Sequence, residues 1–154
     1  MSAVQTGGAE TLRVEMDVPI NAPMERVWEL ITTRLNDWMH GGEDGTGGKL
    51  DLTLEAWPGG RLWRDLGEKG GHLWAFVQVV KPPYLLELYG PMFTSTPTLS
   101  HVTFRLVEDG EHTRLEFSHR ASGPIPADMA SGVTQGWQMT LEGNLKTLCE
   151  GSMT

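Results

Sequence analysis

Apolar and polar residues alternate with a period of two over most of this chain, as expected for β-strands with one buried face. The alternation begins with residues 12–20 and recurs in later segments that are separated by glycine- and proline-rich turns. Leu50–Leu54 and Arg61–Leu66 flank a Trp-Pro-Gly-Gly turn, which predicts a hairpin. The other predicted strands cover residues 72–80, 85–89, 99–107 and 113–120.

The period changes to that of a helix after the first strand. Asn21 and Pro23 are residue types that favour a helix start, Asn as a cap and Pro where no N–H is needed. The apolar stripe that follows has helical spacing and consists of Met24, Val27, Trp28, Ile31 and Leu35. The pattern weakens at Thr32 and Thr33, so we expect a break or a short second turn that ends near Trp38.

A second helical pattern begins near Asp128 and predicts an amphipathic helix of about six turns, roughly 30 Å long. Its apolar residues fall within one arc of the helix and are Met129, Val133, Trp137, Leu141, Leu145 and Leu148. Gly132, Gly136 and Gly143 project beside this arc, although each costs about 1 kcal/mol of helix stability relative to alanine. We expect either that another backbone packs closely against these glycines or that the helix bends.

Together these elements predict an α+β fold, in which a curved antiparallel sheet of six to seven strands covers one face of the long C-terminal helix. We expect a flexible N-terminal tail over residues 1–10 and a single domain over residues 11–150. Five glycines between His40 and Gly48 predict an exposed mobile loop that could gate a site. A sheet that bends around a helix leaves a gap, and an apolar gap forms a ligand cavity.

The composition narrows the class of protein. The chain has 154 residues, a net charge of −8 and one cysteine, and its aromatic residues are six Trp, two Tyr and four Phe. A single cysteine cannot form an internal disulfide, and dispersed acidic charge repels nucleic-acid phosphates and anionic membranes. No apolar segment is long enough for a secretion signal or a membrane span. We therefore expect a cytoplasmic protein that binds neither nucleic acid nor membrane.

Several motifs, taken in order, resemble a known superfamily. They are Val18–Trp28, Gly59–Trp63, Val80–Leu85, Thr103–Leu106 with Thr113–His119, and Gly136-Trp137 with Leu141. Over about residues 12–149 the chain resembles the SRPBCC superfamily of START and birch-pollen-allergen-like proteins. Within it, the chain is similar to bacterial homologues of the activator of heat-shock protein 90 ATPase. The resemblance implies a helix-grip fold, but no single function, because members include ligand carriers, polyketide cyclases and co-chaperone domains.

The main functional prediction is a cavity between the sheet and the last helix that binds a small apolar or aromatic molecule. Tryptophans near strand ends suit the mouth of such a cavity, because the indole has an apolar body and an N–H that needs a partner. The residues expected to line it are Trp38, Trp57, Trp63, Phe104, Phe117, His119, Trp137 and Leu141. The same residues also fit ordinary core packing. The facing of Trp74 and Phe76 stays open, because both alternations of their strand are apolar.

Two other functions fit the same plan. In the first, the protein is a cyclase- or dehydratase-like enzyme on a polyketide-type substrate, with His119 and Asp65 as acid or base, and His119 must then touch the cavity. In the second, it is a co-chaperone or stress-response module that binds a protein partner through an exposed face. We favour ligand binding without covalent catalysis, because no Gly-x-Ser-x-Gly elbow occurs and Cys149 has no adjacent histidine.

Neither a cofactor nor a metal site is predicted. The five histidines include no pair with metal-ligand spacing, and no Cys-x-x-Cys occurs. His40, Glu43 and Asp44 lie close in sequence, but the glycine-rich surroundings favour a solvated loop over a metal site. The Gly-Gly-Lys of the same loop lacks the Ser or Thr that follows the lysine in a phosphate-binding loop.

Overall fold

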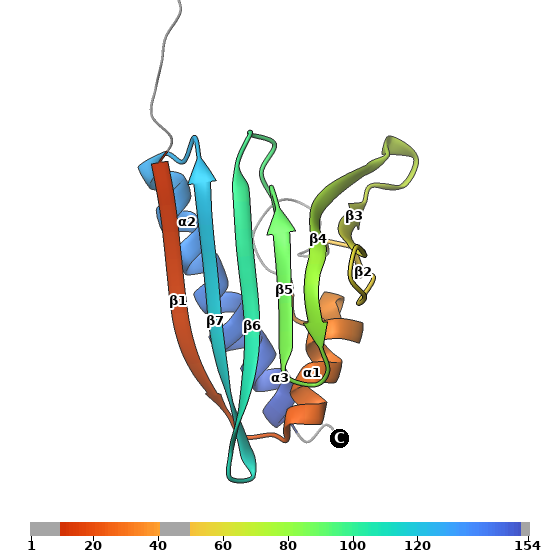
Figure 1. Cartoon of the computed structure of the whole chain (residues 1–154), viewed down its shortest axis with the longest axis vertical. Coiled ribbons are helices and arrows are strands. Elements are labelled where there is room, and N and C mark those ends of the chain that lie inside the picture. The colour runs from red at the N-terminus through yellow and green to blue at the C-terminus, as the bar shows by residue number, and fades with distance from the viewer. Residues whose placement is uncertain (1–9, 41–49, 152–154) are drawn as a thin grey trace, which may run out of the picture.

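The computed structural model describes residues 10–40 and 50–151 and contains one antiparallel seven-stranded sheet. The strand order is β1-β7-β6-β5-β4-β3-β2, so that β2 to β7 form a meander and β1 pairs with β7 (Figure 1). The strands are β1 (Glu10–Ile20), β2 (Leu52–Leu54), β3 (Arg61–Asp65), β4 (Gly71–Lys81), β5 (Leu85–Gly90), β6 (Leu99–Asp109) and β7 (His112–Gly123). These bounds confirm the predicted strands and the hairpin.

The helical segments are α1 (Met24–Thr33), η1 (Leu35–Asp37), η2 (Gly67–Lys69), α2 (Ala127–Trp137), η3 (Gln138–Leu145) and α3 (Lys146–Glu150). The last three follow one another without a break and run along one face of the sheet, behind β1, β7 and β6 in Figure 1. The architecture is therefore the helix-grip α+β fold. The predicted tail and the glycine-rich loop lie outside the described residues, apart from Glu10 and His40. Within the described residues, no helix is both long and apolar enough to cross a membrane.

The start of α1 differs from the prediction. Pro23 is the cap residue, with extended backbone angles, and no side chain caps the helix. Asn21 instead donates its backbone N–H to Glu150 Oε2 at 2.7 Å, which joins the end of β1 to α3. The predicted break after Thr33 is confirmed, because α1 ends there and η1 forms the short turn before Trp38. Trp38 is fully buried and donates its indole N–H to the Leu30 carbonyl at 2.8 Å.

The C-terminal helix has the predicted apolar arc, and Trp137, Leu141 and Leu145 of that arc are buried. Its centre, η3, is a π-helix, and π-helical turns occur frequently at functional sites. The glycines of this helix do not mark close packing. A Cβ built on Gly132, Gly136 or Gly143 meets no atom within 4 Å, so each faces open space. The expectation of a backbone packed against them is wrong.

A bulge in β4 settles the facing of its aromatic residues. The pairing of β3 with β4 shifts between Leu62 and Trp63, and Trp74 lies between the two paired positions Leu73 and Ala75. Trp74 and Ala75 are both buried, because the bulge interrupts the alternation of the strand at Trp74. Phe76 pairs instead with Tyr89 of β5, with ring centroids 5.8 Å apart.

Candidate functional site

A cleft of about 510 Å³ lies between the C-terminal helix and the β3–β4 end of the sheet. One wall is formed by α2 and the start of η3, and the opposite wall by β3, β4 and the segment between β5 and β6. Its lining residues are Met39, His40, Leu50, Arg64, Trp74, Phe93, Thr94, Ser95, Thr96, Met129, Gly132, Val133, Gly136, Trp137, Met139 and Thr140. The volume and the apolar, aromatic character of the walls are those of a small-molecule site.

Two glycines make room for the cleft. Gly132 and Gly136 lie one helical turn apart on α2, line the cleft and have no atom within 4 Å of an added Cβ. Any larger residue at either position would place its side chain in the cleft. The open space that the glycines face is therefore the cleft itself.

The centre of the domain is filled by aromatic rings. The ring centroids of Phe117 and Trp137 are 4.5 Å apart, and those of Phe104 and Phe117 are 5.1 Å apart. Trp38 packs edge-on against Phe104 at 6.2 Å. The space left between Trp38, Phe104 and Trp137 is about 10 Å³, no more than one water needs. The interior is thus packed here, and the open volume lies at its flank.

His119 lies in a buried hydrogen-bonded chain behind this cluster. The Trp137 indole N–H donates to His119 Nδ1 at 2.9 Å, and His119 Nε2 lies 2.9 Å from Ser100 Oγ. Because an indole only donates, Nδ1 is the acceptor, and the ring proton is on Nε2, which donates to Ser100. The ring is 2% exposed, and burial lowers the pKa of His119 to about 4. The imidazole is therefore neutral, and both of its nitrogens are engaged.

The eight residues that the sequence predicted to line the cavity do not lie together in the structure. Trp137 lines the cleft, while Trp38, Phe104, Phe117 and Leu141 are buried in the core. His119 is buried among residues next to Phe93, beside the cleft but not in its lining. Trp57 is 58% exposed in the turn before β3, and Trp63 lies on β3 beneath the Arg61 guanidinium, 5.8 Å from the ring centroid.

Sequence reasoning missed several residues of the cleft, chiefly Arg64, Trp74 and Phe93. The bulge hides the facing of Trp74, since alternation fails at that position. Phe93 lies in a turn-rich segment between two strands, where no period applies. The helix glycines could have indicated the cleft, because they line it together with the apolar residues Met129 and Val133 of the same helix.

Among the described residues, the other titratable group that the sequence suggested for catalysis, Asp65, lies apart from the cleft. Asp65 accepts the Gly67 backbone N–H at 2.7 Å in the turn after β3 and does not line the cleft. No group of three His, Cys, Asp or Glu side chains that could hold a metal occurs among the described residues. Of the acidic loop residues considered beside His40, both Glu43 and Asp44 lie outside the described ranges.

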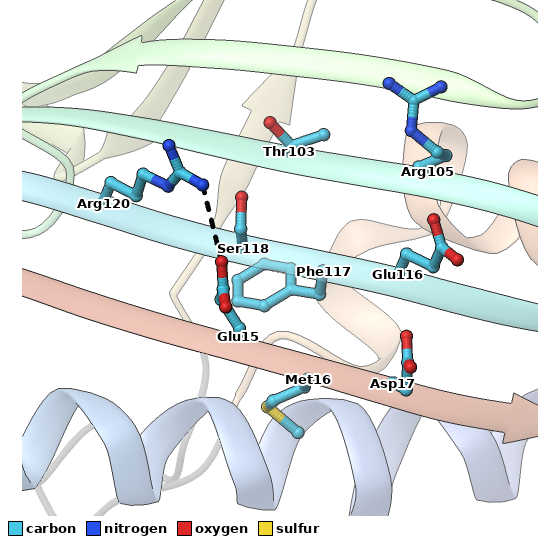
Figure 2. A pocket seen from close by; sticks show the side chains of 9 residues that line it. All are labelled: Glu15, Met16, Asp17, Thr103, Arg105, Glu116, Phe117, Ser118 and Arg120. Atoms are coloured by element: carbon cyan, nitrogen blue, oxygen red, sulfur yellow. Dashed lines mark hydrogen bonds and ion pairs between the residues drawn. The ribbon is translucent and has the colours of Figure 1, made fainter.

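A second depression, of about 370 Å³, lies on strands β1, β7 and β6. It is lined largely by charged and hydroxyl side chains, among them Glu15, Arg105, Glu116 and Arg120 (Figure 2). Glu15 and Arg120 form an ion pair across it at 3.5 Å. Such exposed pairs contribute little stability and no desolvated contact surface, so the apolar cleft is the stronger candidate for ligand binding.

The comparison with protein families agrees with the fold. The family described as "Activator of Hsp90 ATPase homolog 1-like protein" matches residues 21–150, so the chain belongs to this family. The resemblance found in the sequence motifs is thereby confirmed. A search of curated proteins gives no match.

Solved structures share the fold at low sequence identity. An uncharacterized protein from Rhizobium leguminosarum is 20% identical, with a TM-score of 0.72 over 92% of this chain and 96% of that chain. The Aha1 dimer from Colwellia psychrerythraea is 18% identical, with a TM-score of 0.66 over 93% and 99% of the two chains. CalU16 from Micromonospora echinospora is 19% identical, with a TM-score of 0.61 over 95% and 88%. These likenesses establish the fold, and the function has to be argued from the site.

Proposed function

We propose that this member of the Hsp90-ATPase-activator-like family binds a small apolar or aromatic molecule in the cleft between α2 and the β3–β4 end of the sheet. The observation that supports the proposal is the pair of glycines in the helix wall. Each costs the helix about 1 kcal/mol relative to alanine, and neither is needed for packing, because its surroundings are open. A cleft that must accept a ligand explains this cost.

The apolar walls would contribute most of the binding free energy. Met129, Val133 and Trp137 come from the helix, and Trp74 and Phe93 come from the opposite wall. Burial of apolar surface stabilises a complex by about 25 cal/mol per Å², less the cost of ordering the ligand. Methionine side chains adapt to ligands of different shape, which favours a class of related molecules over one exact fit.

The enzymatic alternative is less well supported. It requires His119 to reach the cavity, whereas both ring nitrogens are hydrogen-bonded within the core and the ring is outside the cleft lining. Proton transfer to a ligand would have to break the Trp137 or the Ser100 hydrogen bond. Asp65 is likewise directed to its own turn. We therefore propose binding without acid–base catalysis.

The test uses a fluorescent apolar probe and a pair of matched helix variants. N-phenyl-1-naphthylamine, whose emission rises in apolar surroundings, is titrated into the wild type, Gly136→Leu and the control Gly143→Leu. Both substitutions replace a helical glycine that has open space around it, but only Gly136 lines the cleft. Both variants gain helix propensity, so neither is expected to unfold.

Gly136→Leu should weaken probe binding. If the leucine displaces two methylene-sized groups of the probe, the loss is about 1.6 kcal/mol, or about fifteenfold in Kd. Gly143→Leu should bind as the wild type does. Equal binding by all three proteins would contradict the proposal. A protein partner held by exposed side chains such as Leu99 and Tyr89 would be unaffected by either variant, which separates the co-chaperone alternative.

A further inference from the structure

Trp74 is a wall residue of the cleft whose polar atom has no partner. The side chain is 4% exposed, and its Nε1 is buried without a hydrogen-bond acceptor in the described part of the chain. Buried indole N–H groups normally find a partner, because leaving one unpaired is costly. An unpaired donor beside an apolar cleft indicates that the missing acceptor belongs to what the cleft binds.

Two other buried indoles are satisfied within the fold, whereas Trp63 Nε1, outside the cleft, is buried without a partner among the described residues, as Trp74 Nε1 is. Trp38 donates to the Leu30 carbonyl at 2.8 Å, and Trp137 donates to His119 Nδ1 at 2.9 Å. Trp74 is therefore different from the two other tryptophans that are almost fully buried. The difference coincides with its position, because the bulge in β4 brings it into the cleft wall.

The electrostatic character of the cleft also favours an oxygen acceptor. Arg64 is the cationic residue of the lining, and the hydroxyl residues include Thr94, Thr96 and Thr140. No Asp or Glu is present among the lining residues that the structure describes. An indole N–H only donates, so Trp74 Nε1 is complementary to a carbonyl or carboxylate oxygen.

We propose that the ligand is an aromatic or apolar molecule bearing a carbonyl or carboxylate oxygen that accepts a hydrogen bond from Trp74 Nε1. This inference rests on the proposed function of the cleft and adds the chemical group that it recognises. Phe93, which also lines the cleft, packs edge-on against Trp74 with ring centroids 5.6 Å apart.

The test compares three naphthalene probes of similar shape that differ in the hydrogen-bond acceptor. 2-Acetylnaphthalene has a carbonyl, 2-ethylnaphthalene has none, and 2-naphthoate supplies the carboxylate form. Their dissociation constants are measured by displacement of N-phenyl-1-naphthylamine from the wild type, Trp74→Phe and Trp63→Phe. Trp63 is the matched control, because its Nε1 is also buried and unpaired in the described structure, but the residue does not line the cleft.

For each protein, the dissociation constant of 2-ethylnaphthalene is divided by that of each oxygen-bearing probe. For at least one of these probes, the ratio should be about tenfold larger in the wild type than in Trp74→Phe. Trp63→Phe should keep the wild-type ratio. An unchanged ratio in Trp74→Phe, with 2-ethylnaphthalene still binding, would overturn this inference and leave the proposed function standing. Failure of all probes to bind, or binding that Gly136→Leu does not weaken, would overturn both.

A second measurement does not depend on the variants folding. In ¹⁵N-labelled wild type, the indole N–H signals of the six tryptophans are followed during titration. One signal should move downfield with 2-acetylnaphthalene or 2-naphthoate and not with 2-ethylnaphthalene, because only the oxygen forms a hydrogen bond. The same shifts with all three probes would contradict the assignment.

Discussion

Acidification should destabilise this protein through His119. The unfolded chain takes up a proton at an ordinary histidine pKa of 6.5, whereas burial lowers the pKa of His119 in the folded chain to about 4. Between these values the unfolded state binds more protons, so stability is highest above pH 6.5 and falls as the pH decreases towards 4. At about 1.36 kcal/mol per pKa unit, the full loss is about 3 kcal/mol. Small domains have about 5–15 kcal/mol in total.

The assay is urea unfolding, followed by far-ultraviolet circular dichroism, at several pH values from about 7.5 to about 4.5. His119→Gln removes the titrating group and leaves a side chain that can still form hydrogen bonds. The variant will be less stable at neutral pH, but its free energy of unfolding should change little over this range. The control is His101→Gln, because His101 is on the surface beside Glu87 and should leave the wild-type slope in place.

The three carboxylates whose pKa values are lowered affect stability only at the acidic end of this pH range. Hydrogen bonds from Arg13, Arg61 and Lys146 hold the pKa values of Glu15, Glu55 and Glu150, respectively, below the usual 4.5. Their stabilisation is complete about one pH unit above that value and is lost as the pH falls through it, in the His119→Gln variant as in the wild type. An equal pH slope in His119→Gln and the wild type above pH 4.5 would refute the assignment of His119 as a neutral buried imidazole.

Two further predictions concern the C-terminal helix. Burial raises the pKa of the Cys149 thiol to about 12, so the folded protein should not react with 5,5′-dithiobis(2-nitrobenzoate) at about pH 8, whereas the urea-unfolded chain should react within minutes. Arg26 donates to the carbonyls of Leu148 and Cys149 at 3.0 and 2.8 Å, so Arg26→Ala should lower the free energy of unfolding by about 2 kcal/mol. The exposed control Arg13→Ala should change it by less than about 0.5 kcal/mol; an equal loss in both variants would contradict a specific role for Arg26.

The fold could be predicted because its signals are local and repeated. Seven strands and the final helix appear as regular periods, and the motif order of the family supplies the sheet that covers the helix. The start of α1 could not be predicted in detail. Asn21 has the right chemistry for a cap, but its backbone N–H donates to Glu150, which lies 129 residues away in the sequence. Such long-range contacts override local preference.

The candidate site was predicted less well, for a related reason. A side-chain period of two assigns faces only while the strand is regular, and the bulge in β4 buries Trp74 and Ala75 in succession. Phe93 reaches the cleft from a segment without any period. The sequence did predict that the C-terminal helix contributes to the site, since Trp137 belongs to the aromatic cluster and also lines the cleft.

Different residues of this chain fill the core and leave the cleft open. The rings of Phe104, Phe117 and Trp137 fill the centre of the domain, so the open volume of the cleft does not come from a hollow core. It comes from the absence of side chains at Gly132 and Gly136 on the flank of the same helix. Substitutions at these two glycines can therefore leave the packing of the core unchanged. The proposed function therefore predicts that substitution at the helix glycines changes ligand preference without a loss of core packing, and Trp137 contacts both the core and the cleft.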